Sequence, residues 1–212
     1  MSAPQSYYVP MDAGEAEFTE KRSRFLGPVR RVETEAEARA FLDEMRKKYY
    51  DARHNCWCYV LHEGGVVRYG DDGEPQGTAG QPMLNVLQRE GVENDVCVVT
   101  RYFGGVLLGA GGLTRAYAKS AKDALDAAGK ARMRLWSAVT VDCPYPMLER
   151  LKLLAAAHGG TVEGTDFGAA VSVRILLPQE NAAGFDAALT ELSAGTMTAR
   201  REGGRFLPGP RE

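Results

Sequence analysis

Residues 98–117 combine the features that proteins use to bind anions. A β-branched run leads into a loop with five glycines, and the loop opens directly onto a helical pattern. Backbone N–H groups that gather at such a loop and at a helix N-terminus can bind a phosphate group. The glycines of the predicted phosphate-binding loop are Gly104, Gly105, Gly109, Gly111 and Gly112.

Three basic residues follow the loop on the predicted helix. Arg115, Lys119 and Lys122 stand at three- and four-residue spacings, so their side chains line up along one face. Residues on another face, from Leu113 to Ala128, form the apolar stripe of a helix that packs on a core. The sequence therefore predicts a basic ridge that rises from the glycine loop.

The loop matches neither of two common phosphate-binding motifs. The spacing from Gly104 to Gly109 is that of a P-loop, but Ala110 and Gly111 stand where lysine and serine or threonine are required. Thr114 occupies the place of the third glycine in a dinucleotide fingerprint. The alternative is that the glycines only allow a tight turn and close helix packing.

An acidic loop precedes this region. Asp71, Asp72 and Glu74 stand within four positions, followed by Gln76 and Thr78. Such carboxylates could bind a divalent cation such as magnesium, or they could hold nearby arginines by charge-assisted hydrogen bonds. The spacing is not that of an EF-hand. We favour orientation of Arg101 or Arg115, with magnesium as the alternative and no other cofactor predicted.

Residues 54–62 predict a strand with His54, Cys56, Cys58 and His62 on one face. Structural zinc sites usually combine two ligand pairs across turns, and no second pair is found in the sequence. We therefore predict no metal site and expect the cysteines to fill a core face. His54, at the start of the strand, is the one candidate for acid–base catalysis.

The segment 21–31 predicts a basic strand. It carries five basic residues and no acid, with Lys21, Arg22 and Arg24 at its start. These side chains could meet phosphates, or they could protect a solvated edge strand from pairing with other sheets. Both interpretations stay open.

The composition is that of an ordinary globular protein. Of the 212 residues 44% are hydrophobic and 25% are charged, and the net charge is -2, so any polyanion site must be a local patch. The first residues resemble no signal peptide, and no apolar run could span a bilayer. Four cysteines without disulfide spacing fit a reduced protein. We expect a cytoplasmic location and no membrane partner.

The predicted elements fall into two domains. The expected boundaries are a flexible N-terminus at 1–14, one domain at 15–132, a second at 135–202 and a loose tail at 203–212. Helical stripes in the first domain begin near Thr34, Pro82 and Leu113. In the second domain, strand and helix patterns alternate in the order βαββαβ, which is the ferredoxin-like arrangement.

Several ordered motifs resemble the IMPACT family in its bacterial YigZ-type branch. They are Lys21-Arg22-Ser23-Arg24-Phe25, Ala52-x-His54-Asn55-Cys56, Asp71-Asp72-Gly73-Glu74-Pro75 with Gly77-Thr78-Ala79-Gly80, Val99-Thr100-Arg101-Tyr102-Phe103-Gly104-Gly105, and Leu108-Gly109-Ala110-Gly111-Gly112-Leu113. The resemblance implies an α+β protein of two domains. The N-terminal α/β sandwich would be similar to the second domain of a small-subunit ribosomal protein, to domain four of elongation factor G and to the GHMP kinases. The C-terminal ferredoxin-like domain would be similar to domain five of elongation factor G.

Three functions stay open. Eukaryotic relatives regulate translation initiation, so the resemblance favours binding of RNA or the ribosome, with Arg22, Arg24, Arg101, Arg115, Lys119 and Lys122 at phosphates. Tyr102 or Phe103 could then stack on a base. The second hypothesis is an enzyme acting on a nucleotide or other phosphorylated small molecule. The third is a regulatory module with a translation-related protein partner; the kinase-control role of the eukaryotic proteins is not carried over, because the C-terminal domain replaces their partner-binding region.

Overall fold

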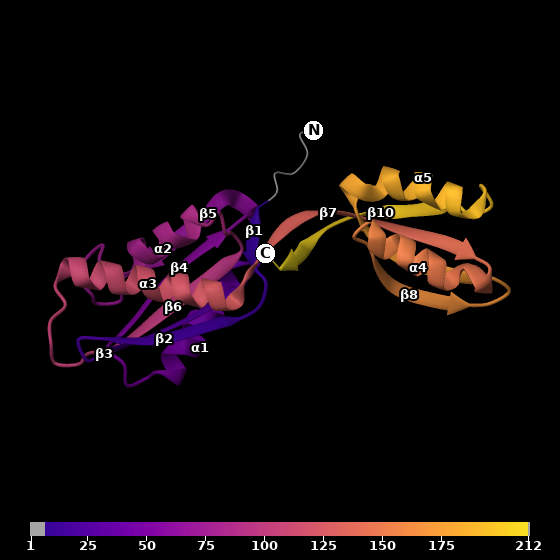
Figure 1. The fold of residues 1–212 in the computed structure, drawn as a ribbon. Coiled ribbons are helices and arrows are strands. Elements are labelled where there is room, and N and C mark those ends of the chain that lie inside the picture. Colours follow the sequence, from indigo (N-terminus) through magenta and orange to yellow (C-terminus); the bar gives the residue numbers. More distant parts are fainter. Residues whose placement is uncertain (1–6, 212) are drawn as a thin grey trace. The chain divides into compact units, whose positions relative to one another are not determined.

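A five-stranded antiparallel sheet organises the first half of the chain (Figure 1). The computed structural model describes residues 7–211. The strand order is β2-β3-β6-β4-β5. The strands are β2 (Gly14–Glu20), β3 (Ser23–Arg31), β4 (His54–Leu61), β5 (Val66–Gly70) and β6 (Asp95–Tyr102).

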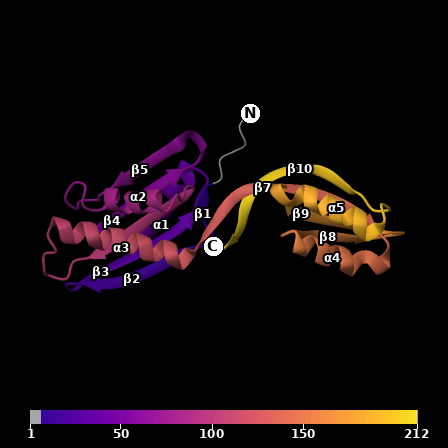
Figure 2. The same cartoon turned by 45° about the horizontal axis from the view of Figure 1, so that its top comes forward.

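Helices cover both faces of this sheet. On one face α2 (Gly80–Arg89) and α3 (Ala110–Ala128) enclose a core that includes Cys56 and Cys58, both fully buried as expected. On the other face α1 (Glu35–Lys48) encloses a smaller core with Phe41. Figure 2 shows α1 and α3 on opposite sides of the strands. The domain therefore has three layers.

Sequence periodicity locates α3 and α1 accurately. The buried residues of α3 are the predicted stripe: Leu113, Ala116, Tyr117, Ser120, Ala121, Ala124, Leu125 and Ala128. Helix α1 begins after Thr34, whose hydroxyl accepts a hydrogen bond from the Glu37 amide at 3.2 Å. Such a cap satisfies one of the amides that a helix start leaves unpaired.

The second half of the chain forms a ferredoxin-like unit. Its elements are β7 (Lys130–Cys143), α4 (Leu148–Ala157), β8 (Thr161–Phe167), β9 (Val171–Pro178), α5 (Ala182–Ser193) and β10 (Ala199–Arg211). The sheet order is β10-β7-β9-β8, and the core lies between it and the two helices. Short 3₁₀ turns lie at Glu63–Gly65, Tyr145–Met147 and Gln179–Asn181. The predicted α+β class with two domains is confirmed.

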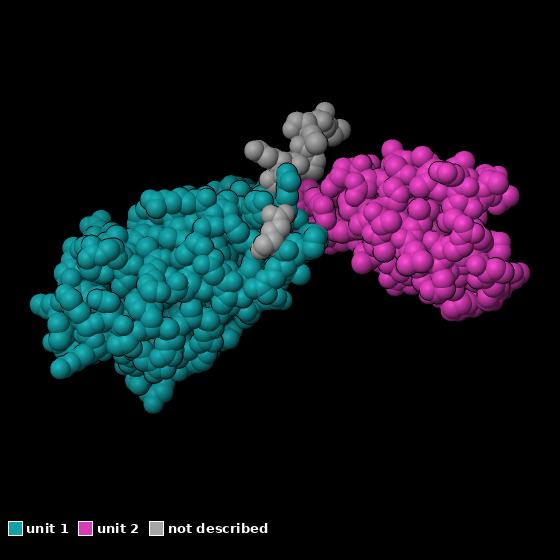
Figure 3. All heavy atoms as spheres, in the orientation of Figure 1, with its two compact units in different colours: residues 1–132, 208–212 teal, residues 133–207 magenta. Residues whose placement is uncertain are grey.

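The chain divides into two compact units, drawn in different colours in Figure 3. One unit holds residues up to 132 together with those from 208 onward, and the other holds 133–207. No helix in the described part of the chain is long and apolar enough to cross a bilayer.

Two expectations about the ends of the chain require correction. The lead-in predicted as flexible at 1–14 is partly regular, because β1 (Tyr8–Pro10) pairs with the start of β7 and β2 begins at Gly14; residues 1–6 lie outside the described residues. The tail predicted as loose at 203–212 belongs to β10 as far as Arg211. This strand contains Pro208 and Pro210. Among the described strands it pairs with β7 alone, and an edge strand tolerates proline.

The basic segment 21–31 is not one strand. Lys21 and Arg22 adopt positive φ angles of 46° and 67° and form the turn between β2 and β3. Because β3 lies between β2 and β6, the interpretation as an edge strand is wrong. Prediction missed this turn because non-glycine residues seldom adopt positive φ.

Candidate functional site

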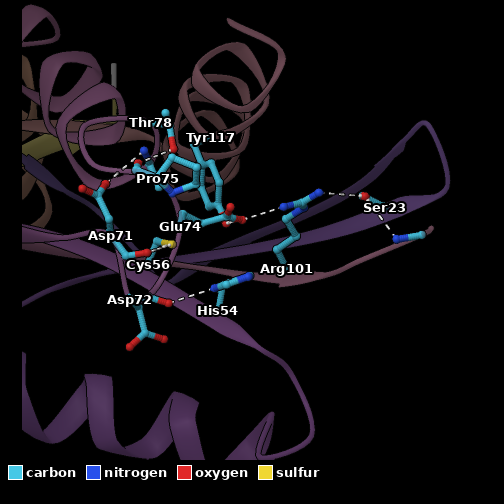
Figure 4. Close-up of polar contacts among 12 residues, drawn as sticks. Ser23, His54, Cys56, Asp71, Asp72, Glu74, Pro75, Thr78, Arg101 and Tyr117 are labelled. Carbon is cyan, nitrogen blue, oxygen red and sulfur yellow. Dashed lines mark hydrogen bonds and ion pairs between the residues drawn. The ribbon is translucent and has the colours of Figure 1, made fainter. Parts of the chain in front are cut away.

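Asp71 closes the N-terminus of α2. One carboxylate oxygen accepts hydrogen bonds from the amides of Ala79 at 3.1 Å and Gly80 at 2.9 Å, and the other accepts one from Gly77 at 2.8 Å. The negative carboxylate also faces the positive end of the helix dipole. Asp71 is therefore already engaged as a helix cap (Figure 4).

Asp72 fastens the acidic loop to the start of β4. Its carboxylate accepts a hydrogen bond from the Asn55 amide at 2.6 Å and forms an ion pair with Arg46 at 3.4 Å. Its carbonyl oxygen lies 2.9 Å from His54 Nδ1, which fixes the imidazole of His54. The neighbouring thiol of Cys56 donates to the Asp71 carbonyl at 2.9 Å.

Glu74 is the member of the acidic loop that orients an arginine. Its Oε1 accepts from Arg101 Nη1 at 2.7 Å and from the Tyr117 hydroxyl at 2.8 Å. The side chains of Glu74 and Arg101 are only 3% and 6% exposed. The expected orientation of Arg101 is thus present in the structure, while Arg115 makes no such contact within the described residues.

Ser23 connects this buried pair to the glycine loop. Its hydroxyl oxygen accepts from Arg101 Nη2 at 3.3 Å and from the Gly104 amide at 3.2 Å. A Cβ at Gly104 would lie 2.0 Å from the Arg22 carbonyl carbon, so only glycine fits here. Glu74, Arg101, Ser23 and Gly104 therefore join three separate segments into one buried network.

The N-terminus of α3 has no side-chain cap. The residue at the cap position is Gly109, with φ of 73°, and the first intrahelical bond runs from the Leu113 amide to its carbonyl. The amides of the first helical turn point out of the helix without an intrahelical acceptor. Unlike the start of α2, where Asp71 supplies the acceptor, the start of α3 can therefore receive an external anion.

A cavity of about 340 Å³ adjoins this helix start, and Arg101 lies at its wall. Other lining residues are Arg53, His54, Phe103, Gly109 and Ala110. Arg101 Nε is buried and has no hydrogen-bond partner among the described residues. The cavity therefore lies between the open end of a helix and a buried arginine.

Phe103 and Tyr102 differ in their availability for stacking. Phe103 is 43% exposed and lies at the cavity, whereas the Tyr102 hydroxyl donates to Asp51 at 2.7 Å. Burial, with Asp51 as a second cause, raises the pKa of Tyr102 to about 12. Phe103 is therefore the better placed of the two aromatic candidates.

The predicted basic ridge is largely neutralised. Lys119 pairs with Asp123, and Lys122 pairs with Asp126 and Glu90. Arg24 is likewise held by Glu17 in a bidentate pair at 2.5 and 2.9 Å. The pairs Lys119–Asp123 and Lys122–Asp126 follow the four-residue spacing that brings side chains together on a helix, so the sequence itself carries a signal for them.

Four basic residues around the loop retain unpaired charge. Within the described residues, Lys21, Arg22, Arg53 and Arg115 have no acidic partner. Lys21 and Arg115 line a second cavity, of about 170 Å³, together with Gly112. Prediction missed Arg53, for which the sequence carries no distinguishing signal.

The remaining predicted positions lie at the edge of the site. Gln76 is exposed, and the Thr78 hydroxyl donates to the Pro75 carbonyl at 2.7 Å, so it closes the turn before α2. Burial raises the pKa values of the Cys56 thiol and the Tyr117 hydroxyl. No group of three or more His, Cys, Asp or Glu side chains in the described part of the chain could hold a metal ion.

Comparisons with known proteins agree with this two-domain organisation. The Impact N-terminal domain family matches residues 21–125, and a family described as a domain of unknown function matches residues 141–196. The IMPACT family member YvyE of Bacillus subtilis is 36% identical over 191 residues, 90% of this chain and 88% of that protein. YigZ of Escherichia coli is 36% identical over 180 residues, 84% of this chain and 88% of that protein.

One solved structure and one eukaryotic relative extend the comparison. A crystal structure of a hypothetical protein has a TM-score of 0.59 and 33% identity, covering 92% of this chain and 96% of that one. Protein IMPACT of Rattus norvegicus is 34% identical over 113 residues, 51% of this chain and 35% of that protein. The sequence motifs, the fold and the near full-length bacterial relatives together place this chain in the IMPACT family.

Proposed function

We propose that the N-terminal domain binds single-stranded RNA, free or within the ribosome, at the start of α3. The observation that carries this proposal is the uncapped helix N-terminus beside the 340 Å³ cavity, which is lined in part by buried Arg101. The Nε of Arg101 has no hydrogen-bond partner among the described residues. A phosphate there would accept hydrogen bonds from the helix amides and from Arg101.

The surroundings suit a nucleotide chain. Lys21, Arg22, Arg53 and Arg115 supply positive charge around the phosphate position, and Phe103 offers an exposed ring for base stacking. The overall net charge of -2 agrees with recognition by a local patch. A role linked to translation, in the cytoplasm, follows from the resemblance to the eukaryotic relatives.

The number of unpaired cations determines the expected salt dependence. Four phosphate contacts give a slope of log affinity against log salt of about -2.8 on single strands, at about -0.7 per contact. The six contacts expected from the sequence alone would give about -4.2. The smaller value applies because Lys119, Lys122 and Arg24 are already paired with carboxylates.

Fluorescence anisotropy of a short labelled single-stranded RNA, across a potassium chloride series, tests this proposal. Arg115→Ala should weaken binding and reduce the slope by about 0.7. Arg89→Ala is the matched control, because Arg89 is an exposed arginine in the last turn of α2. Equal effects of both variants, or no binding at low salt, would reject the site.

A phosphorylated small molecule is the second candidate ligand, with catalysis as its consequence. His54 lines the same cavity, and its volume falls at the lower end of ordinary ligand pockets, about 300–1,000 Å³. The imidazole could then act as an acid or base. Turnover of nucleotides with magnesium that is lost in His54→Gln, without RNA binding, would favour this enzyme over the RNA-binding protein.

A further inference from the structure

A third cavity lies on the opposite face of the same sheet. It has a volume of about 300 Å³ and lies between α1 and strands β4 and β5. Arg39 and Arg46 of α1, Trp57 and Tyr59 of β4, and Arg68 of β5 are among its lining residues. The glycine loop and α3 contribute nothing to it, so this cavity is separate from the proposed RNA site.

The aromatic wall of this cavity is rigid. The Trp57 and Tyr59 rings stack with centroids 5.5 Å apart and planes 14° from parallel. The Tyr59 hydroxyl donates to Glu35 at 2.7 Å, which fixes this ring. A Cβ at Gly70 would lie 2.7 Å from the Trp57 indole, so the indole occupies the space that a larger residue would fill. The Trp57 ring is thus held in place at the cavity wall, while Tyr59, only 4% exposed, supports it.

The other wall of this cavity is positively charged, because three arginines and no acidic residue are among its lining residues. Arg46 pairs with Asp72 at 3.4 Å and approaches Asp43 at 3.9 Å. Among the described residues, Arg39 and Arg68 form no ion pair: Arg39 lies by the Tyr59 hydroxyl, and Arg68 donates to the Val67 carbonyl at 2.9 Å. Arginine keeps its charge and binds phosphate oxygens in a bidentate manner. The cavity therefore favours an anion.

We propose that this cavity binds a free nucleoside phosphate, with the base against Trp57 and the phosphate at Arg39 and Arg68. A planar group and an anion on one small molecule match the two walls, and the volume lies within the range of small-molecule pockets. The two arginines come from different elements, Arg39 from α1 and Arg68 from β5, and both line this cavity. The proposal does not depend on RNA binding at α3.

The two tryptophans of the chain make a direct assay possible. Trp136→Phe removes the indole of the other compact unit and leaves Trp57 as the single reporter. Titration with adenosine and guanosine monophosphates should quench its fluorescence, because a stacked base contacts the indole. Adenosine and inorganic phosphate, tested separately, should bind at least about tenfold more weakly, since each satisfies only one wall.

Two variants and a control complete the test. In the same background Arg39→Ala and Arg68→Ala should each weaken the nucleotide by about tenfold, since hydrogen bonds to charged groups carry effects of that size. Lys47→Ala removes an exposed charge from α1 outside the cavity and should leave the affinity unchanged. Absence of quenching, or quenching that both arginine variants retain, would overturn the proposal. Quenching by an oligonucleotide alone would overturn it in favour of an RNA strand, and loss of RNA binding in Arg115→Ala would leave it unaffected.

Discussion

The buried Glu74–Arg101 pair should dominate the stability of the N-terminal domain. Glu74→Gln keeps the shape of the side chain but leaves the guanidinium of Arg101 without its counter-charge in a site where both side chains are nearly inaccessible to water. Breaking a buried pair by removing one partner costs about 3–5 kcal/mol. The exposed Glu17–Arg24 pair is the matched control, and Glu17→Gln should cost far less, because water screens an exposed ion pair.

Urea unfolding followed by Trp57 fluorescence in the Trp136→Phe background measures this difference for one compact unit. With a slope of about 1.5 kcal/mol per molar urea, a loss of 3 kcal/mol lowers the unfolding midpoint by about 2 M. Such a shift is a large part of the ordinary stability of a domain.

A double-mutant cycle identifies the cause of the loss. Glu74→Gln combined with Arg101→Met removes both charges, so the double variant should be more stable than the sum of the single losses predicts, by at least about 1 kcal/mol. Additive losses, or a cost of Glu74→Gln no larger than that of Glu17→Gln, would refute the account of the network.

Three further predictions concern single positions. Gly104→Ala should destabilise the domain by about 1–3 kcal/mol in the same urea assay, because its Cβ would overlap the Arg22 backbone. Gly111→Ala, whose Cβ would lie 3.5 Å from Arg115 Nη1, should instead stabilise α3 by about 0.5–1 kcal/mol. Equal effects of the two variants would contradict the close approach at Gly104. Asp71→Ala removes the acceptor for three amides at α2 and should cost about 0.5–2 kcal/mol, and a thermal melt that shows no change would contradict the cap. Asp95 is fully buried with both oxygens unpartnered among the described residues, and burial raises its pKa well above the ordinary value of 3.8. An acid whose pKa is raised in the folded state makes the protein less stable as pH rises above the pKa of the unfolded state. Asp95→Asn should therefore stabilise the domain at neutral pH, and urea midpoints should show this gain shrinking as pH falls towards 3.8. A gain that does not depend on pH would contradict this assignment.

Sequence periodicity predicted the helices well because burial repeats along them. The apolar stripe of α3 and the order of strands and helices in the second unit were readable for this reason. The turn at Lys21 and Arg22 could not be predicted from the sequence, because it uses positive φ angles without the glycine or asparagine that usually indicates them. Pro208 and Pro210 indicate a loop, so the sequence predicts a loose tail where the structure has a strand. An edge strand tolerates proline because no neighbouring strand needs a hydrogen bond from its outer amides.

The candidate site was predicted in part for a different reason. Residue types identified the glycine loop and the acidic loop, and charge complementarity pointed to Arg101. Charge alone could not separate Arg115 from Lys119, since the difference lies in the partner Asp123 one turn along the helix. Ser23 and Tyr117 complete the network through contacts between segments far apart in the chain, and local patterns do not encode such contacts.

The most direct test of the central claim is an NMR titration of the protein with the short single-stranded RNA. Binding at the start of α3 predicts chemical-shift changes at the amides of Ala110, Gly111 and Gly112 and at Arg101 Nε. The amide of Gly80 should change little, because Asp71 already occupies the start of α2. Shifts confined to the 133–207 unit or to the paired lysines of α3, with the three amides unmoved, would contradict the claim.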